Sequence, residues 1–192
     1  MKSTEKDDDL KWTVQSRRQD VEYPIFSVNT HYSSHDASDR AGQFVVIDSP
    51  NWVNIIALTQ TDEVILIKQF RHGIEAVTFE IPGGLVDPGE TALEAAQREL
   101  REETGYETDH WHILGELQPN PAFMNNLCTV VLASNVRQSA SQSLDTNEVI
   151  DVHRIPMVDI PSLILSGDIQ HTLVVSAFYL LQARGLHRDS NR

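Results

Sequence analysis

The sequence predicts an α/β sandwich with a mixed central sheet, preceded by an antiparallel β elaboration. Two apolar runs, residues 53–60 and 63–70, are almost continuous, as expected of central strands covered on both faces. An acidic helix is predicted between Thr91 and Gly105, and an apolar helix at 171–185. Strands around an acidic helix, with further helices at the end, indicate helices packed on a sheet. The 192 residues, 40% hydrophobic and 22% charged, suffice for one substantial core.

The N-terminal part is predicted to contain a tail and a small sheet. Residues 1–10 are rich in charge, contain no aromatic side chain and are expected to be disordered. Residues 11–48 hold short runs such as WTVQSRR and GQFVVID between polar clusters such as SSHDASDRAG, which is typical of short strands and turns. This segment has few apolar residues, so we treat it as an elaboration of a domain at residues 49–192.

The main domain begins with the two apolar strands, which are joined by a turn at residues 61–62. A short strand at 78–81 follows and is ended by a proline and the pair Gly83-Gly84. Because glycine has no Cβ, the backbone at this pair can approach a ligand or a metal closely.

Local signals define both ends of the acidic helix. Thr91 with Glu94 three residues later matches a capping box, and Gly105 supplies a left-handed stop. Three apolar positions form the stripe expected to pack on the core: Leu93, Ala96 and Leu100. Beyond the helix, strands are predicted at 110–119, 127–136 and 148–156, loops at 120–126 and 137–147, and helices at 158–167 and 171–185.

Charge and composition narrow the function. The net charge of −13 argues against nucleic acid as a large ligand, because backbone binding needs a basic surface. Cys128 is the single cysteine, lies in an apolar run and is expected to be a buried strand thiol. No stretch approaches the roughly 20 apolar residues of a membrane span, so a cytoplasmic protein with no membrane partner is expected.

The acidic helix carries three carboxylates on one side: Glu99, Glu102 and Glu103. A helix turns once every 3.6 residues, so spacings of three, four and one bring them together. Like charges at such spacings weaken a helix by roughly 0.2–0.5 kcal/mol per pair, so a cation is expected between them. Hard divalent ions such as Mg²⁺ prefer these oxygen ligands and serve phosphate chemistry.

The segment around this helix resembles the Nudix box. The matching positions are Gly84, Glu90 and the run Arg98-Glu99-Leu100-Arg101-Glu102-Glu103-Thr104-Gly105-Tyr106. The resemblance implies an α/β/α sandwich and a pyrophosphohydrolase that uses Mg²⁺, with Mn²⁺ as a possible substitute. It implies an architectural role for Glu90, although a carboxylate in a first helical turn is also favoured by the helix dipole.

The resemblance also implies a ligand set. Glu99 and Glu103 are the first metal ligands, together with the backbone carbonyl of Gly83, and Glu102 shares a further ion. Arg98 lies four residues before Glu102, so its guanidinium can hold that carboxylate in place.

Outside the box, the sequence is similar to one branch of the family, the ADP-ribose pyrophosphatases and nucleoside diphosphate sugar hydrolases. Pro121 lies where that branch has a marker proline, and Phe123 in the same loop is assigned with it to substrate binding. The segment 145–152 resembles a loop that carries a catalytic glutamate, here Glu148. Several members have a second acid two residues earlier, where this chain has Thr146.

Other candidates contact the substrate. Arg71 matches an arginine that reaches substrate phosphates in similar enzymes, or it is a solvated cation at a strand end. His72 beside it could assist. Four aromatic side chains could stack on a base or pack in the core: Trp12, Tyr23, Phe26 and Trp52.

These expectations combine into one main hypothesis. Water attacks one phosphorus of ADP-ribose or a nucleoside diphosphate sugar while Glu148 takes its proton, giving a nucleoside monophosphate and a sugar phosphate. One alternative is a nucleoside triphosphate, dinucleoside polyphosphate or capped RNA end as substrate. Another is a nucleotide-sugar sensor without turnover. The branch also implies a homodimer in which the N-terminal sheets complete the partner's site.

Overall fold

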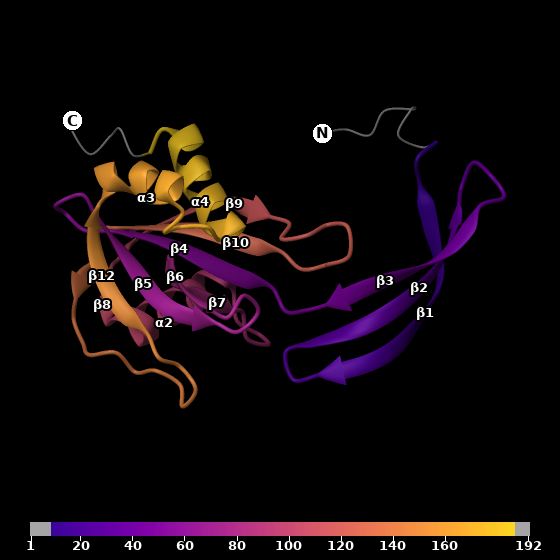
Figure 1. Cartoon of the computed structure of the whole chain (residues 1–192), viewed down its shortest axis with the longest axis horizontal. Coiled ribbons are helices and arrows are strands. Elements are labelled where there is room, and N and C mark those ends of the chain that lie inside the picture. The colour runs from indigo at the N-terminus through magenta and orange to yellow at the C-terminus, as the bar shows by residue number, and fades with distance from the viewer. Residues whose placement is uncertain (1–8, 187–192) are drawn as a thin grey trace. The chain divides into compact units, whose positions relative to one another are not determined.

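Two compact units make up the part of the chain that the computed structural model describes, residues 9–186 (Figure 1). The first contains residues up to Pro50 together with 118–126, and the second contains the rest. The tail predicted at residues 1–10 lies outside the described residues except for its last two, which form a turn. The domain limits at 11–48 and 49–192 stay predictions. No helix within residues 9–186 is long and apolar enough to cross a membrane.

The first unit is a three-stranded antiparallel sheet, as the sequence predicts. Its strands, in spatial order, are β1 (Trp12–Tyr23), β2 (Phe26–His35) and β3 (Ala41–Asp48). The loop 118–126 joins this unit because the Ile47 N–H donates to the Phe123 carbonyl at 2.7 Å and the Asn125 amide donates to Asp48 at 2.8 Å. β1 is an edge strand of this sheet and is exposed along nearly its whole length.

The second unit is built on a mixed seven-stranded sheet. Its strands are β4 (Trp52–Leu58), β5 (Glu63–Arg71), β6 (Ala76–Glu80), β7 (Gly83–Leu85), β9 (His110–Leu117), β10 (Cys128–Ser134) and β12 (Asp151–Pro156). The order is β12-β5-β4-β10-β9, with β6 beside β5 and β7 beside β4. Only β4 and β10 run parallel, which confirms a mixed sheet. A separate ribbon pairs β8 (Tyr106–Glu107) with β11 (Arg137–Gln138).

Helices cover both faces of this sheet. They are α2 (Ala92–Thr104) on one face, and η1 (Met157–Asp159), α3 (Ile160–Ser166) and α4 (Thr172–Arg184) associated with the other. Alternate residues of β4 divide between the two cores: Val53 and Ile55 pack toward α2, whereas Ile56 and Leu58 pack toward α3 and α4. This alternation confirms the α/β/α sandwich and explains why the strand reads as a continuous apolar run.

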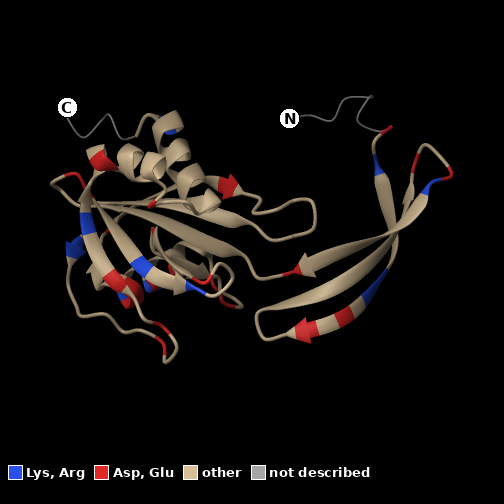
Figure 2. Ribbon diagram, in the orientation of Figure 1, with Lys and Arg blue, Asp and Glu red and all other residues tan. Residues whose placement is uncertain are grey.

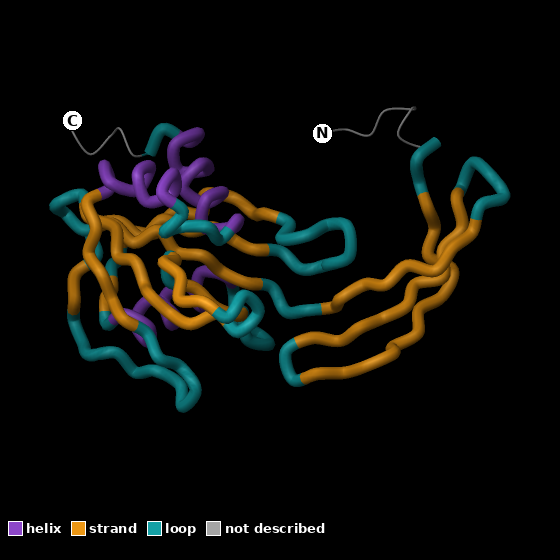
Figure 3. The backbone as a smooth tube through the Cα atoms, in the orientation of Figure 1, coloured by secondary structure: helices purple, strands orange, loops and turns teal. Residues whose placement is uncertain are grey.

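The long connection between β11 and β12 is an irregular loop, residues 139–150 (Figure 3). Gln142 ties it to the second unit, because its side-chain amide donates to the carbonyls of Glu103 at 2.6 Å and Ile150 at 3.2 Å. Acidic segments occur in both units (Figure 2).

Candidate active site at the acidic face of helix α2

The ends and the buried side of α2 fix where its acidic residues lie. Thr91 is the N-cap: its hydroxyl accepts from the Glu94 N–H at 3.2 Å, and its own N–H donates to the Glu94 carboxylate at 2.8 Å. Gly105 ends the helix with φ 73°, as predicted. Ala96 and Leu100 are fully buried against the sheet. The helix therefore cannot rotate without exposing this apolar side.

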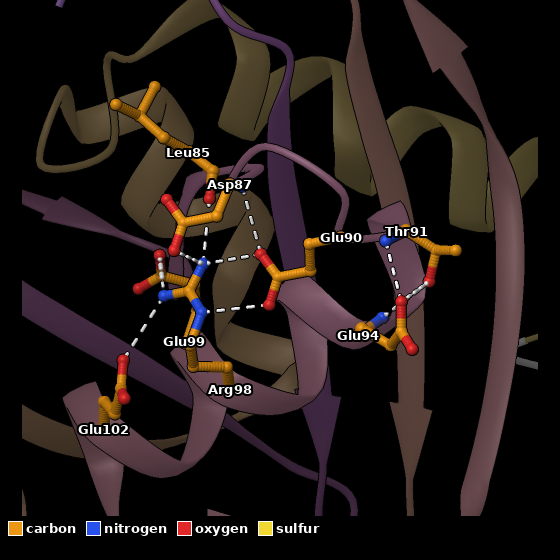
Figure 4. Close-up of polar contacts among 8 residues, drawn as sticks. All are labelled: Leu85, Asp87, Glu90, Thr91, Glu94, Arg98, Glu99 and Glu102. Carbon is orange, nitrogen blue, oxygen red and sulfur yellow. Dashed lines mark hydrogen bonds and ion pairs between the residues drawn. The ribbon is translucent and has the colours of Figure 1, made fainter.

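Arg98 forms hydrogen bonds with several carboxylates of the acidic face (Figure 4). Its Nε and Nη2 donate to the two oxygens of Glu90, each at 3.0 Å, and Nη1 donates to Glu99 at 2.8 Å and Glu102 at 3.3 Å. The hydrogen bonds to Glu90 are the largest of the effects that raise the pKa of Arg98. Arg98 thus holds Glu102, as the sequence predicts, and holds two further carboxylates more closely.

Glu90 lies one residue before the N-cap, so the expected position in the first helical turn is wrong. Its carboxylate instead accepts the Arg98 fork and the Asp87 N–H at 3.1 Å, which anchors the loop that enters the helix.

Glu103 is a buried carboxylate beneath the glycine turn. It is 3% exposed, and its Oε2 accepts the Gly83 N–H at 2.9 Å. Burial, with smaller contributions from Glu99 and Glu148, raises the pKa of Glu103 to about 8, although the Gly83 N–H and Arg71 act in the opposite direction. The predicted contact of the Gly83 carbonyl with a metal stays a prediction, since the contact seen here uses its N–H.

Glu99 packs directly on Gly84. A Cβ at Gly84 would lie 2.2 Å from Oε1 of Glu99, closer than any side chain could approach. Gly83 is restricted in the same way, because its Cβ would lie 2.1 Å from the Val53 carbonyl oxygen. The two glycines therefore let β4, β7 and the carboxylates meet. Burial raises the pKa of Glu99, and the neighbouring Glu102 and Glu148 add to this effect.

Loop 139–150 brings Glu148 into the same electrostatic environment. Glu148 is exposed, and it caps its own turn by accepting the Asp145 N–H at 3.1 Å. Its charge contributes to the raised pKa of both Glu99 and Glu103, although it lies 45 residues beyond the helix residues in sequence. Thr146 lies on this loop two residues before Glu148.

An ion pair between a buried carboxylate and a half-exposed arginine adjoins the acidic cluster, and the sequence patterns did not indicate it. Glu80, 3% exposed, accepts Arg71 Nε at 2.8 Å and Nη2 at 2.6 Å, and Thr78 donates to it at 2.8 Å. His171 Nδ1 lies 3.4 Å away. Burial alone would raise the pKa of Glu80, but Arg71, with His171 and Thr78, holds it well below its usual range. An acid within the short strand TFEI was the only available signal.

The donor set suits a hard divalent cation. Glu103 is buried and Glu99 partly buried; burial is the main cause of their raised pKa values, neighbouring carboxylates add to it, and a cation relieves both effects. Within residues 9–186, however, no three aspartate, glutamate, histidine or cysteine side chains converge as they do around an ion. Arg98 neutralises Glu99 and Glu102 in the present arrangement. Arg98 contacts only Oε1 of Glu99 and Oε2 of Glu102, which leaves the second oxygen of each carboxylate to a cation.

The remaining candidates are spread over both units. Pro121 and Phe123 lie in the first unit, as do Trp12, Tyr23 and Phe26, while Trp52 lies half-buried at the start of β4. The ring of His72 packs edge-on against Phe70. Cys128 is fully buried, which raises the pKa of its thiol to about 12 and agrees with a structural role.

Comparison with known proteins places this arrangement among known folds. The model of the NUDIX domain matches residues 50–176. An ADP-ribose pyrophosphatase of Bacillus subtilis is 28% identical over 146 residues, which cover 76% of this chain and 79% of that protein. The ADP compounds hydrolase NudE of Escherichia coli is 30% identical over 121 residues, covering 63% and 64%. A crystal structure of an ADP compounds hydrolase, 24% identical, covers 94% of this chain and 97% of its own with a TM-score of 0.82.

Proposed function

The chain belongs to the NUDIX family of hydrolases, and from that premise we propose that it cleaves the pyrophosphate bond of ADP-ribose or of a nucleoside diphosphate sugar. The products are a nucleoside monophosphate and a sugar phosphate. The observation that carries the proposal is the position of Glu99 and Glu103 at the glycine turn, where Glu99 packs on Gly84 and Glu103 accepts the Gly83 N–H. The names of the bacterial relatives support ADP-containing substrates.

Each of the candidate residues has a separate role in the proposed hydrolysis. Glu148, on its exposed loop, takes the proton of the attacking water. Arg71 is oriented by Glu80 through Nε and Nη2, which leaves Nη1 to donate to a phosphate oxygen. Arg98 positions Glu99 and Glu102. Pro121 and Phe123 are proposed to contact the substrate.

We propose that the reaction also needs a divalent cation, Mg²⁺, for which Mn²⁺ can substitute. When bound, it supplies Lewis-acid stabilisation of the phosphoryl oxygens. Glu99, Glu103, Glu102 and the Gly83 carbonyl would hold it. Their carboxylates must be deprotonated to do so, which a cation favours despite burial.

A substrate panel tests the proposal. ADP-ribose, GDP-mannose, ADP-glucose, diadenosine polyphosphates and nucleoside triphosphates are each incubated with Mg²⁺ or Mn²⁺, and the products are identified by chromatography. We expect AMP and ribose 5-phosphate from ADP-ribose. Turnover confined to nucleoside triphosphates or dinucleoside polyphosphates would assign the enzyme another substrate, and tight binding without any product would make it a sensor.

We further propose that the protein is a cytoplasmic homodimer. The first unit supports a dimer, because β1 is an edge strand and large apolar side chains of the unit are exposed, including Trp12, Tyr23 and Phe44. Sedimentation equilibrium is expected to give twice the chain mass of 21.6 kDa, and a single-chain mass would remove this part of the proposal.

A further inference from the structure

An open pocket of about 490 Å³ lies in the second unit, away from the acidic cluster. It is bounded by the turn between β4 and β5, by the ribbon of β8 and β11, and by β12. Glu99, Glu102, Glu103 and Glu148 are not among its lining residues. The volume lies within the range of sites that take small molecules.

The lining of this pocket contrasts with the chain as a whole. Although the net charge is −13, the pocket is lined by Arg137, Arg154 and His110, and no aspartate or glutamate is among its described lining residues. Further polar groups come from the side chains of Asn135, Gln60, Gln138, Thr59 and Thr61. Cationic and neutral polar groups without a carboxylate are the donors that an anion needs.

Both arginines are held in place by carboxylates outside the pocket. Arg137 Nη2 donates to Glu107 at 3.0 Å, and Arg154 Nη2 donates to Glu63. In each pair only Nη2 is a recorded donor, and a guanidinium has five N–H groups, so others can serve a ligand. Both arginine side chains are more than half exposed, so solvent screens their ion pairs and each guanidinium stays accessible to a ligand.

Two of the residues that line the pocket are buried and bring apolar surface to it. Tyr106 is 7% exposed and Val136 is 4% exposed. Tyr106 is paired with Gln138 in the ribbon, and the Val136 N–H donates to the Leu58 carbonyl at 2.9 Å. A ring and a valine side chain offer contact to the organic body of a ligand, while the arginines above bind its charge.

We propose that this pocket is a second binding site, which takes a small phosphate monoester. Two guanidinium groups match the double charge and the three terminal oxygens of a phosphate monoester better than they match a carboxylate, which has one charge and two oxygens. A sugar phosphate or a nucleoside monophosphate has this chemistry, and the pocket volume accommodates its organic body. The site is independent of the hydrolytic function proposed above.

Titration of the full chain tests the site. In EDTA, so that no cation draws phosphate to the acidic cluster, ribose 5-phosphate, AMP and inorganic phosphate are titrated by calorimetry, while NMR follows the imidazole ring of His110. We expect saturable binding of the esters with shifts of the His110 ring, and weaker binding of inorganic phosphate. The two ester arms distinguish a sugar phosphate from a nucleotide as the preferred ligand.

Two variants locate the binding. Asn135→Asp places a carboxylate in the pocket with little change in shape, and aspartate tolerates the left-handed backbone found there, φ 55°. Arg137→Gln with Arg154→Gln removes both guanidinium groups. Each is expected to weaken ester binding at least about tenfold. The matched control, Arg17→Gln with Arg18→Gln in β1, removes the same charge from the first unit and should leave the affinity unchanged.

Several results would overturn the site. They are the absence of saturable ester binding, equal affinity for inorganic phosphate and the esters, or affinity that is unchanged in Asn135→Asp and in the arginine variant. The Asn135→Asp variant keeps the test decisive if the double arginine variant does not fold.

Discussion

Glu80 and Glu103 are two equally buried carboxylates, but Glu80 is paired with a cationic side chain whereas Glu103 lies near other carboxylates. Each is 3% exposed. Glu80, on β6, receives both arms of the Arg71 fork and the Thr78 hydroxyl, and its pKa lies well below its usual range. Glu103, on α2, receives one backbone N–H and faces the negative charges of Glu99 and Glu148, and its pKa is raised to about 8.

The difference shows that burial alone does not set the role of a carboxylate. Removing a carboxylate from water disfavours its ionised form in both places. At Glu80 the protein supplies the compensating cation, so the charge becomes part of a structural pair that orients Arg71. At Glu103 the Gly83 N–H and Arg71 do not offset burial and the negative charges of Glu99 and Glu148, which is the arrangement expected of the cation site proposed above.

The largest effect is expected from Glu103→Gln. If Glu103 is a metal ligand, turnover of ADP-ribose with excess Mg²⁺ should fall about 10²–10⁴-fold, because a ligand charge is lost from the site. The same change should raise the thermal midpoint in EDTA at neutral pH, because glutamine, unlike Glu103, does not gain free energy by ionising when the chain unfolds. Wild-type turnover in the variant would mean that Glu103 does not hold the metal. Glu116→Gln on β9, an exposed acid, serves as the control.

Gly84→Ala is expected to reduce activity by about 10–100-fold, through Glu99. The new Cβ would overlap the Glu99 carboxylate and push it from its place beside Glu103. Steady-state kinetics at several Mg²⁺ concentrations should show a raised metal requirement. Gly73→Ala is the matched control, because a Cβ there meets nothing within 4 Å. Equal metal requirements in the two variants would contradict a role for the Glu99 position.

Features that depend on residues close together in the sequence were predicted, and contacts between distant residues were not. The capping box at Thr91 and the stop at Gly105 were predictable because they depend on residues three or four apart. The strands covered on both faces were predictable from continuous apolar runs. The pair of Glu80 with Arg71 was not, because it depends on the register of β5 with β6, which places both side chains on one face of the hairpin.

The charged neighbours of Glu99 and Glu103 could not be predicted from the sequence either, because they also lie far away along the chain. The resemblance suggested Glu148 as a base, but its influence on Glu99 and Glu103 depends on the path of loop 139–150. The association of 118–126 with the N-terminal strands likewise depends on contacts between distant segments, such as Ile47 with Phe123. No periodicity within either segment encodes such contacts.

Glu80→Gln should destabilise the protein by about 1–2 kcal/mol, a modest value because Arg71 remains nearly half exposed and can be solvated. Urea unfolding in EDTA measures the change. KM for ADP-ribose should rise more than kcat falls, since Arg71 loses its orientation. Glu75→Gln in the same hairpin is the control, with an expected change within about 0.5 kcal/mol. If stability and KM were both unaltered in Glu80→Gln, the pair with Arg71 would contribute neither to the fold nor to substrate binding.

The last prediction concerns the pH dependence of stability, which has opposite directions for the two carboxylates. Between pH 5 and pH 8, folded Glu103 retains a proton that the unfolded chain, with a glutamate pKa of about 4.3, has released. The folded state then binds more protons, so the metal-free protein should lose stability as pH rises through this window. Glu80 is ionised in both states there, and its contribution is lost only as pH falls below the unfolded pKa toward its lowered folded value.

Urea unfolding in EDTA across this window should therefore show a decline to which Glu103 contributes nearly the limiting slope of about 1.4 kcal/mol per pH unit, less as pH approaches 8. Glu99, whose pKa is also raised, adds a slope of the same sign, so the informative quantity is the difference between wild type and Glu103→Gln. That difference should diminish as pH falls toward 5. If the variant kept the full wild-type slope, Glu103 would be ionised throughout, and the contrast with Glu80 would rest on geometry alone.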